Sequence, residues 1–244
     1  MNRRELLTKG IAAAAAFATG LRGPNVLAQS LKKESLDLTP GDVCTLTCAA
    51  TLGPCYYSGT TVRQDITEGK SGLPTLLSFL IVDADTCQPI QDATIDIWHT
   101  DNNGVYSAPI NAMCNPNDAL ARQKTFLRGV QPTDSNGWAH FNSIYPGWYS
   151  GRTTHIHATI RRNNGEMVTT QFFFDDTLSD FIYHNHGSYS HRPNKDTTNL
   201  SDNVIGGSAS RVKPFLFTPK LIDQKSLVAL KVIAIRSVRT TCSA

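Results

Sequence analysis

Two histidines separated by one residue, His155 and His157, are the residues of this sequence best placed to bind a metal ion. The residues that alternate with them are aliphatic, so an extended strand would put both imidazoles on one face and the aliphatic side chains in a core. Two imidazoles on a rigid strand are a good pair of metal ligands. A pair of structural histidines is the simpler interpretation of this spacing, but the nearby Tyr106, Tyr149 and Arg152 favour a metal site.

The two tyrosines indicate which metal. Tyr106 follows a predicted strand and turn, and Tyr149 lies in the loop before the histidine strand. If both join the histidines, the donor set is two phenols and two imidazoles. A free tyrosine titrates near about pH 10, so only a strong Lewis acid holds two phenolates at neutral pH. This donor set favours ferric iron over ferrous iron or zinc.

The sequence around these residues resembles a known enzyme family. The resemblance is carried by FLRGVQPTDSNGWAHFNSIYPGWYSGRTTHIH, with IDIWHTDNNGVYS before it and TTQFFF after it. It is to the intradiol ring-cleavage dioxygenases, in particular their small exported, protocatechuate-dioxygenase-like branch. It covers most of the chain after the N-terminal segment. The resemblance implies four ligands to ferric iron, at Tyr106, Tyr149, His155 and His157.

The resemblance also implies roles for neighbouring residues. Tyr149 matches the axial ligand that substrate displaces, and Arg152 matches an arginine that stabilises negative charge. Gln171 matches a glutamine beside the site, and Trp98 a tryptophan of the pocket wall. The family's GPYY segment reads GPCYY here, so the match leaves open whether Tyr56 or Tyr57 takes the substrate-contacting place, and the residue that we expect to contact substrate is Tyr57.

The implied reaction is cleavage of a catechol-type diol by O₂ to a cis,cis-muconate-type diacid. The expected cofactor is therefore Fe(III), and the expected partners are a small catechol-type molecule and O₂. The sequence leaves open which catechol is cleaved and how many subunits assemble.

The first 28 residues predict an export signal. Arg3 and Arg4 precede a short Ala-rich apolar run that is too short to span a membrane, and residues 26–28 are of the kind that precede a cleavage site. We expect a twin-arginine-type signal over residues 1–28, one domain over residues 29–244, and export to the periplasm or the medium.

The charge and the cysteines fit an exported enzyme. The formal net charge is +3, and the predicted signal carries this excess, so no basic patch favours a nucleic acid or a membrane surface as partner. The six cysteines are an even number, which favours disulfides in an exported chain. Their pairing stays open. A metal cluster of Cys44, Cys48 and Cys55 is the alternative, but it has no CxxC spacing.

Alternating and continuous apolar runs predict strands, and no long amphipathic helix stands out. Asn163-Asn164-Gly165 predicts a hairpin between two of the strands. Residues 175–225 predict a long loop region, which would carry His184, His186 and His191. The fold class we expect is all-β: an antiparallel β-sandwich with long loops, in a single domain. The predicted strands are 75–84, 93–100, 138–144, 154–162, 167–174 and 226–238.

Three other classes share parts of this pattern. A cupin also has two histidines at this spacing but needs a glutamate four or five residues later, where this chain has Arg161 and Arg162. An extradiol ferrous enzyme needs two histidines and a carboxylate, and it leaves the tyrosines unused. A non-catalytic transthyretin-like or carbohydrate-binding β-sandwich shares the strand pattern but has no use for the histidines or Arg152. We therefore expect an enzyme.

Overall fold

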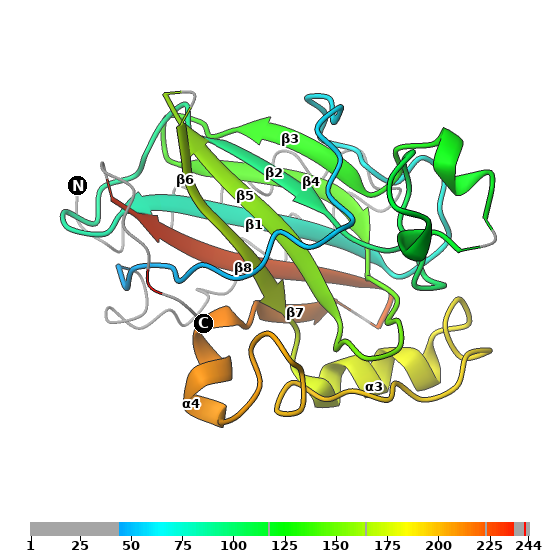
Figure 1. The fold of residues 1–244 in the computed structure, drawn as a ribbon. Coiled ribbons are helices and arrows are strands. Elements are labelled where there is room, and N and C mark those ends of the chain that lie inside the picture. Colours follow the sequence, from blue (N-terminus) through cyan, green and yellow to red (C-terminus); the bar gives the residue numbers. More distant parts are fainter. Residues whose placement is uncertain (1–43, 117, 164, 223, 237–241, 243–244) are drawn as a thin grey trace.

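The chain folds into two four-stranded sheets packed face to face (Figure 1). The structure is a computed structural model that describes residues 44–242 except 117, 164, 223 and 237–241. The predicted export signal lies outside the described residues. The predicted β-sandwich is confirmed. One sheet has the order β4-β1-β8-β7 and the other β3-β2-β5-β6. The strands are β1 (Pro74–Asp83), β2 (Thr94–Trp98), β3 (Arg128–Pro132), β4 (Trp138–Ile144), β5 (His155–Arg162), β6 (Gly165–Phe173), β7 (Thr218–Ile222) and β8 (Ser226–Ile235).

The first sheet is mixed, because its two long central strands run parallel. β1 pairs antiparallel with β4 but parallel with β8, with Thr75 opposite Leu227. Both strands are buried over most of their length, and continuous apolar runs are typical of such strands. A parallel pair needs a crossover connection, and here the whole second sheet lies within it. In this pair the structure corrects the antiparallel arrangement that we predicted.

The second sheet is antiparallel and contains the predicted hairpin. β5 pairs with β6 across residues 163–165, and Asn163 has a positive φ of 50°, which asparagine tolerates in turns. β2 pairs with β5 on one side and with β3 on the other. The sequence did not predict β3 or β7, because both are five residues long and each contains a proline.

The core lies between the sheets and is rich in aromatic side chains. Phe79 of β1 is fully buried at its centre. Its ring centroid is 6.1 Å from those of Phe141 and Phe172 and 5.9 Å from that of Phe217. Phe172 belongs to the other sheet, so these contacts join the two layers, at distances typical of attractive aromatic pairs.

Residues 175–225 are more regular than predicted. They contain helix α3 (Asp176–Asn185), helix α4 (Ala209–Val212) and strand β7 (Figure 1). Asp175 caps α3 by accepting hydrogen bonds from two backbone N–H groups. The predicted loop was wrong here because so short a helix shows no long apolar stripe in its sequence. Among the described residues, no helix is long and apolar enough to cross a membrane. The short 3₁₀ helices are η2 (Ala112–Cys114), η3 (Ala121–Gln123) and η4 (Lys213–Phe215).

All six cysteines form disulfides, as predicted. All three bridges attach the segment before β1, one to residue 87 after β1, one to residue 242 and one to residue 114. The third bridge lies beside the candidate site. The pairs are Cys44–Cys87, Cys48–Cys242 and Cys55–Cys114.

We predict that Phe79→Ala lowers the free energy of unfolding by about 3–5 kcal/mol, because it removes a ring that both sheets contact and leaves a cavity. Phe181→Ala on α3 is the matched control. The Phe181 side chain is 38% exposed, so its loss should cost about 1 kcal/mol or less. Denaturant unfolding of the two variants measures the difference, and equal losses would contradict the assignment of Phe79 to the centre of the core.

Candidate metal centre

One residue from each strand of the second sheet forms a row across its outward face. Backbone pairing puts Trp98 opposite both Arg128 and His157, and His157 opposite Gln171. The Trp98 and His157 rings stack with centroids 4.9 Å apart. The aliphatic residues that alternate with them lie in the core, as strand parity predicts. All four side chains of the row are nonetheless buried, so connecting segments cover this face.

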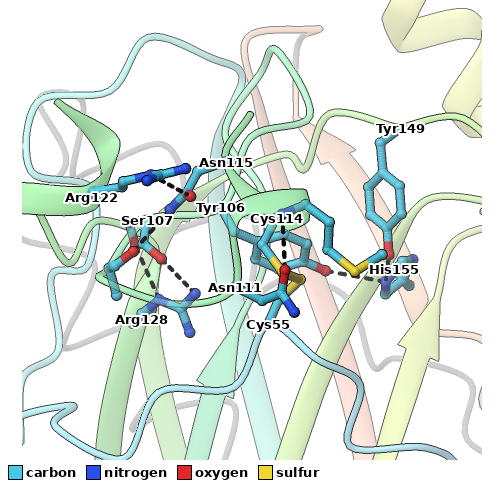
Figure 2. Close-up of a disulfide and its surroundings, with 12 residues drawn as sticks. Cys55, Tyr106, Ser107, Asn111, Cys114, Asn115, Arg122, Arg128, Tyr149 and His155 are labelled. Atoms are coloured by element: carbon cyan, nitrogen blue, oxygen red, sulfur yellow. Dashed lines mark hydrogen bonds between the residues drawn. A yellow bond between two sulfur atoms is a disulfide. The ribbon is translucent and has the colours of Figure 1, made fainter. Parts of the chain in front are cut away.

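His155 lies on the same face and meets both predicted tyrosine ligands (Figure 2). Its Nδ1 donates to the carbonyl oxygen of Thr153 at 2.7 Å, so the unprotonated Nε2 faces the site. The hydroxyl oxygens of Tyr106 and Tyr149 are 3.3 and 3.2 Å from this Nε2. The ring of His157 is 4.9 Å from that of His155. The structure therefore brings together all four predicted ligands.

The two loops that carry the tyrosines interlock through glycines. Gly147 donates its N–H to the carbonyl oxygen of Asp101 at 2.9 Å. A Cβ atom on Gly147 would lie 2.4 Å from that oxygen, and one on Gly104 would lie 2.2 Å from a carbonyl oxygen of the Tyr149 loop. Gly104 also has a positive φ of 80°. These glycines let the backbones approach closely enough to set Tyr106 beside Tyr149.

The Cys55–Cys114 disulfide packs directly beside Tyr106 (Figure 2). Both cysteines are buried in a cluster with Trp98 and Tyr106. The N–H of Tyr106 donates to the carbonyl oxygen of Cys114 at 3.0 Å. The bridge therefore links the segment before β1 to the loop that holds Tyr106. Cys55 is also the residue that makes the segment GPCYY instead of GPYY.

Of the two tyrosines after Cys55, Tyr56 contacts the row. Its ring meets Trp98 edge-on, with centroids 5.0 Å apart. Its hydroxyl donates to Asp96 at 3.2 Å and accepts from Arg161 at 3.0 Å. Tyr57 is half-buried, and its hydroxyl end lies against Gly59. Substrate contact by Tyr57 stays a prediction.

Arg152 and Gln171, predicted to lie beside the site, contact each other. The Nη2 of Arg152 donates to Oε1 of Gln171 at 2.5 Å, and its Nε donates to Asp202 at 2.9 Å. Gln171 in turn donates to the carbonyl oxygen of Thr51 at 2.8 Å. The guanidinium is thus held on two sides. The sequence did not reveal Asp202, because this partner lies fifty residues away in the predicted loop.

Burial keeps the two imidazoles neutral. It lowers the pKa of His155 to about 3, with the Arg152 charge acting in the same direction. Burial also lowers the pKa of His157 well below its usual value, and His155 and Arg152 add to this. A neutral imidazole is the form that binds a metal. Both histidines therefore have the protonation state of ligands.

Burial keeps the two phenols protonated when no cation is present. It raises the pKa of Tyr106 well above its usual value, and the neighbouring Tyr149 acts in the same direction. Burial also raises the pKa of Tyr149, although Arg152 opposes this. A cation that binds here must therefore be a strong enough Lewis acid to displace both protons.

The donor atoms fit a metal ion. Two atoms bound to one ion at roughly 2.0–2.2 Å lie about 3 Å apart, close to the 3.2 and 3.3 Å between the tyrosine oxygens and Nε2 of His155. In the part of the chain that the structure describes, no group of three or more His, Cys, Asp or Glu residues could hold a metal. A metal centre at this place therefore depends on the tyrosines.

Arg128 and Asp96 also lie on this face, although neither was predicted as a site residue from the sequence. Arg128 donates to the side chain and to the carbonyl oxygen of Ser107 at 3.0 and 2.7 Å (Figure 2), and its Cζ is 5.8 Å from the centre of the Tyr106 ring. Asp96 is buried next to Tyr56 and Arg161. Their positions follow from alternation with core residues, which marks a face but not a function.

The second group of histidines lies elsewhere. His184 belongs to α3, not to a loop, and its Nε2 is 2.9 Å from Oδ1 of Asn194. His186 ends the helix and packs on Tyr189. The sequence prediction of a loop was wrong for His184 because α3 was missed.

Comparison with known proteins identifies the family. The family model described as Dioxygenase matches residues 52–184, more than half of the chain. A solved intradiol ring-cleavage dioxygenase from Tetranychus urticae has a TM-score of 0.68 and 29% identity, over 81% of this chain and 98% of that one. The chain belongs to the intradiol ring-cleavage dioxygenase family. The proposed protocatechuate-like branch stays a prediction.

Two further proteins share less sequence identity with this chain. Catechol 1,2-dioxygenase 1 from Acinetobacter lwoffii is 25% identical over 158 residues, 54% of this chain and 48% of that protein. The chain therefore spans about half the length of the curated relatives it matches. The dioxygenase domain of a carbohydrate-binding fusion from Streptomyces sp. SirexAA-E has a TM-score of 0.57 at 19% identity, over 80% of this chain and all of that domain, and so shares the fold.

The buried carboxyl of Asp96 predicts a pH-dependent stability. Burial raises its pKa to about 6, although Arg161 opposes this. The folded state therefore binds an additional proton between about pH 4 and 6, and stability falls as the pH rises through that range. We expect the free energy of unfolding of the wild type, relative to Asp96→Asn, to be lower at pH 7 than at pH 4 by about 2–3 kcal/mol. Denaturant unfolding of metal-free protein measures it.

Asp83→Asn is the control, because the pKa of Asp83 is shifted in the opposite direction from that of Asp96. Hydrogen bonds from Thr86 lower the pKa of Asp83, so its stabilisation is present at neutral pH and is lost only as the pH falls below about 4. The same direction of change in both variants would contradict the assignment for Asp96.

Proposed function

We propose that this protein is a non-haem Fe(III) intradiol dioxygenase. It cleaves a catechol-type aromatic diol with O₂ to a cis,cis-muconate-type diacid. The observation that carries the proposal is the meeting of the Tyr106 and Tyr149 hydroxyls at Nε2 of His155, beside His157. The relatives support the substrate class, since they include a catechol 1,2-dioxygenase and a chlorocatechol 1,2-dioxygenase from Pseudomonas putida.

The donor set supports ferric iron. Phenolates are hard, anionic ligands, and phenols whose pKa values are raised by burial need a strong Lewis acid to lose their protons. A ferrous centre of the usual kind uses two histidines and a carboxylate, and the described residues offer no such group. Two phenolates and two neutral imidazoles would leave one positive charge of Fe(III) for a further anion to balance.

The two tyrosines have different access to substrate. Bound ferric iron supplies the Lewis acidity that draws electron density from the diol and makes its ring reactive toward O₂. Tyr106 is buried, whereas Tyr149 is partly exposed, so an entering diol meets Tyr149 first. The Tyr149 oxygen, as phenolate, is suited to accept a proton from a diol hydroxyl. The neutral His155 and His157 keep their positions on the rigid strand.

The residues around the ligands orient the substrate and stabilise charge. The guanidinium of Arg152 is permanently charged, so it stabilises negative charge that develops on the ring or on oxygen. Gln171 holds it from one side. Trp98 forms a flat wall next to His157, and Tyr57 is the expected further contact. Both atoms of O₂ enter the product as the bond between the two hydroxyl-bearing carbons breaks.

We also propose that the protein is exported. The twin arginine and the short apolar run of residues 1–28 support an export signal. The three disulfides support an oxidising compartment, because such bridges rarely persist in the cytosol.

The metal assignment predicts about one iron per chain and a red-brown colour from phenolate-to-iron charge transfer. His155→Ala and His157→Ala should each remove most of the iron, because each deletes a donor that the strand holds in place. His184→Ala is the control and should retain it, since this side chain bonds to Asn194 on α3. Elemental analysis and visible absorbance measure both effects. A colourless wild type that carries zinc would contradict the proposal.

The charge on Arg152 predicts a selective loss of turnover. Arg152→Gln should keep the iron and the colour but lower kcat by about 100-fold, as for other lost electrostatic donors. KM should change less, because the charge develops after substrate has bound. Arg236→Gln, which removes a half-exposed arginine paired with Asp85, is the control. Unchanged turnover in Arg152→Gln with full iron would remove Arg152 from the mechanism.

A further inference from the structure

Asp202 is a buried carboxylate that reaches the site from the segment after α3. Its side chain is fully buried. Oδ2 accepts hydrogen bonds from Nε of Arg152 at 2.9 Å and from the N–H of Thr153 at 3.0 Å. Oδ1 accepts a hydrogen bond from the N–H of Val204 at 2.9 Å. This bond fixes the carboxylate relative to the backbone that immediately follows it. One side chain from a distant segment thus anchors two consecutive residues of the site.

The anchored residues lead directly to the metal ligand His155. The carbonyl oxygen of Thr153 accepts the proton of His155 Nδ1 at 2.7 Å. The hydroxyl of Thr153 donates to Asn199, in the same segment as Asp202, at 3.0 Å. The backbone between Arg152 and His155 is therefore held in place by the segment that contains Asn199 and Asp202. The Asp202 carboxylate determines the position of this backbone.

The charge of Asp202 also decides how Arg152 is oriented. A guanidinium is planar, and two nitrogens of this one donate hydrogen bonds, Nε to Asp202 and Nη2 to Gln171. These two bonds fix the plane of the group. The pKa of Asp202 supports an ionised carboxylate: burial acts to raise it, but Arg152 and the backbone N–H groups of Val204 and Thr153 outweigh burial and lower it.

We propose that Asp202 is a positioning residue for ring cleavage. Its carboxylate holds the Arg152 guanidinium in the orientation that stabilises negative charge on the substrate. The inference rests on the proposed function, since it assigns Asp202 a role through Arg152. It goes further in placing part of the active-site machinery in the segment after α3, outside the strands and loops that carry the ligands.

A double-mutant cycle on the iron-loaded enzyme tests the proposal. Asp202→Asn keeps the shape of the side chain but removes its charge. We expect it to lower kcat by about tenfold with KM changed less than threefold, as for a lost charged positioning contact. In an Arg152→Gln background the same change should have little further effect on kcat, because the charge that Asn removes acts on Arg152, whereas the Asn oxygen can still accept the N–H of Thr153. Equal losses of kcat in both backgrounds would overturn the proposal, since they indicate a structural role alone.

The matched control is Asp134→Asn. The carboxylate of Asp134 also accepts two backbone N–H groups in a turn, at 2.9 and 2.8 Å, but lies in the connection between β3 and β4. The Asp134→Asn variant should therefore leave kcat unchanged. If Asp202→Asn does not fold, the same cycle is run with Asp202→Glu, which retains the charge on a longer chain. Failure of both variants to fold would also reject the proposal, in favour of a structural role.

The same four proteins without metal give a second measurement that does not depend on activity. The unfolding constants should show a coupling between Asp202 and Arg152 of about tenfold or more. If the wild type does not cleave catechols, the proposed function fails, and the coupling still reports whether the two residues act as a pair. Additive effects on unfolding would show that they do not, and would overturn the inference.

Discussion

Desolvation of the four donor side chains is the constraint on which the rest of this structure depends. Two imidazoles and two phenols meet in a region from which water is largely excluded, and burial drives all four toward their neutral forms. Such a group of polar atoms is costly to bury unless each atom finds a partner. The trivalent cation that we propose would offset this cost, because it would convert the phenols to anions and give the imidazoles a partner.

The surrounding structure keeps these donors from rearranging. The histidines lie on a central strand with neighbours on both sides, and Trp98 stacks on one of them. The tyrosine loops are locked by glycine contacts and by the disulfide beside Tyr106. Rigid support of this kind is what distinguishes a preorganised site from side chains that are merely close together.

The sequence was informative where local rules apply. The alternation around His155 and His157 determined their common face, because a strand has a period of two. The same rule explains why Trp98, expected at the pocket wall from the resemblance, lies on the face opposite the core. The turn residues of the β5–β6 hairpin marked the position of that hairpin. The sequence was uninformative where partners are distant. The bond from Arg152 to Asp202 joins residues in unrelated segments, and helix α3 is too short and too polar to show a periodic stripe.

The parallel pairing of β1 with β8 affects how the chain can fold. The strand next to β1 in the centre of the first sheet is β8, which follows all the other described strands along the chain. β1 can therefore pair with β8 only after the whole chain between the two strands has been synthesised. Contacts between residues so distant in sequence make folding slow. Until then the apolar edge of β1 stays exposed, and such an edge can pair with another chain. A chain shortened by β8 would keep all four side chains of the candidate metal centre, yet it would lack the strand that completes the sheet behind them.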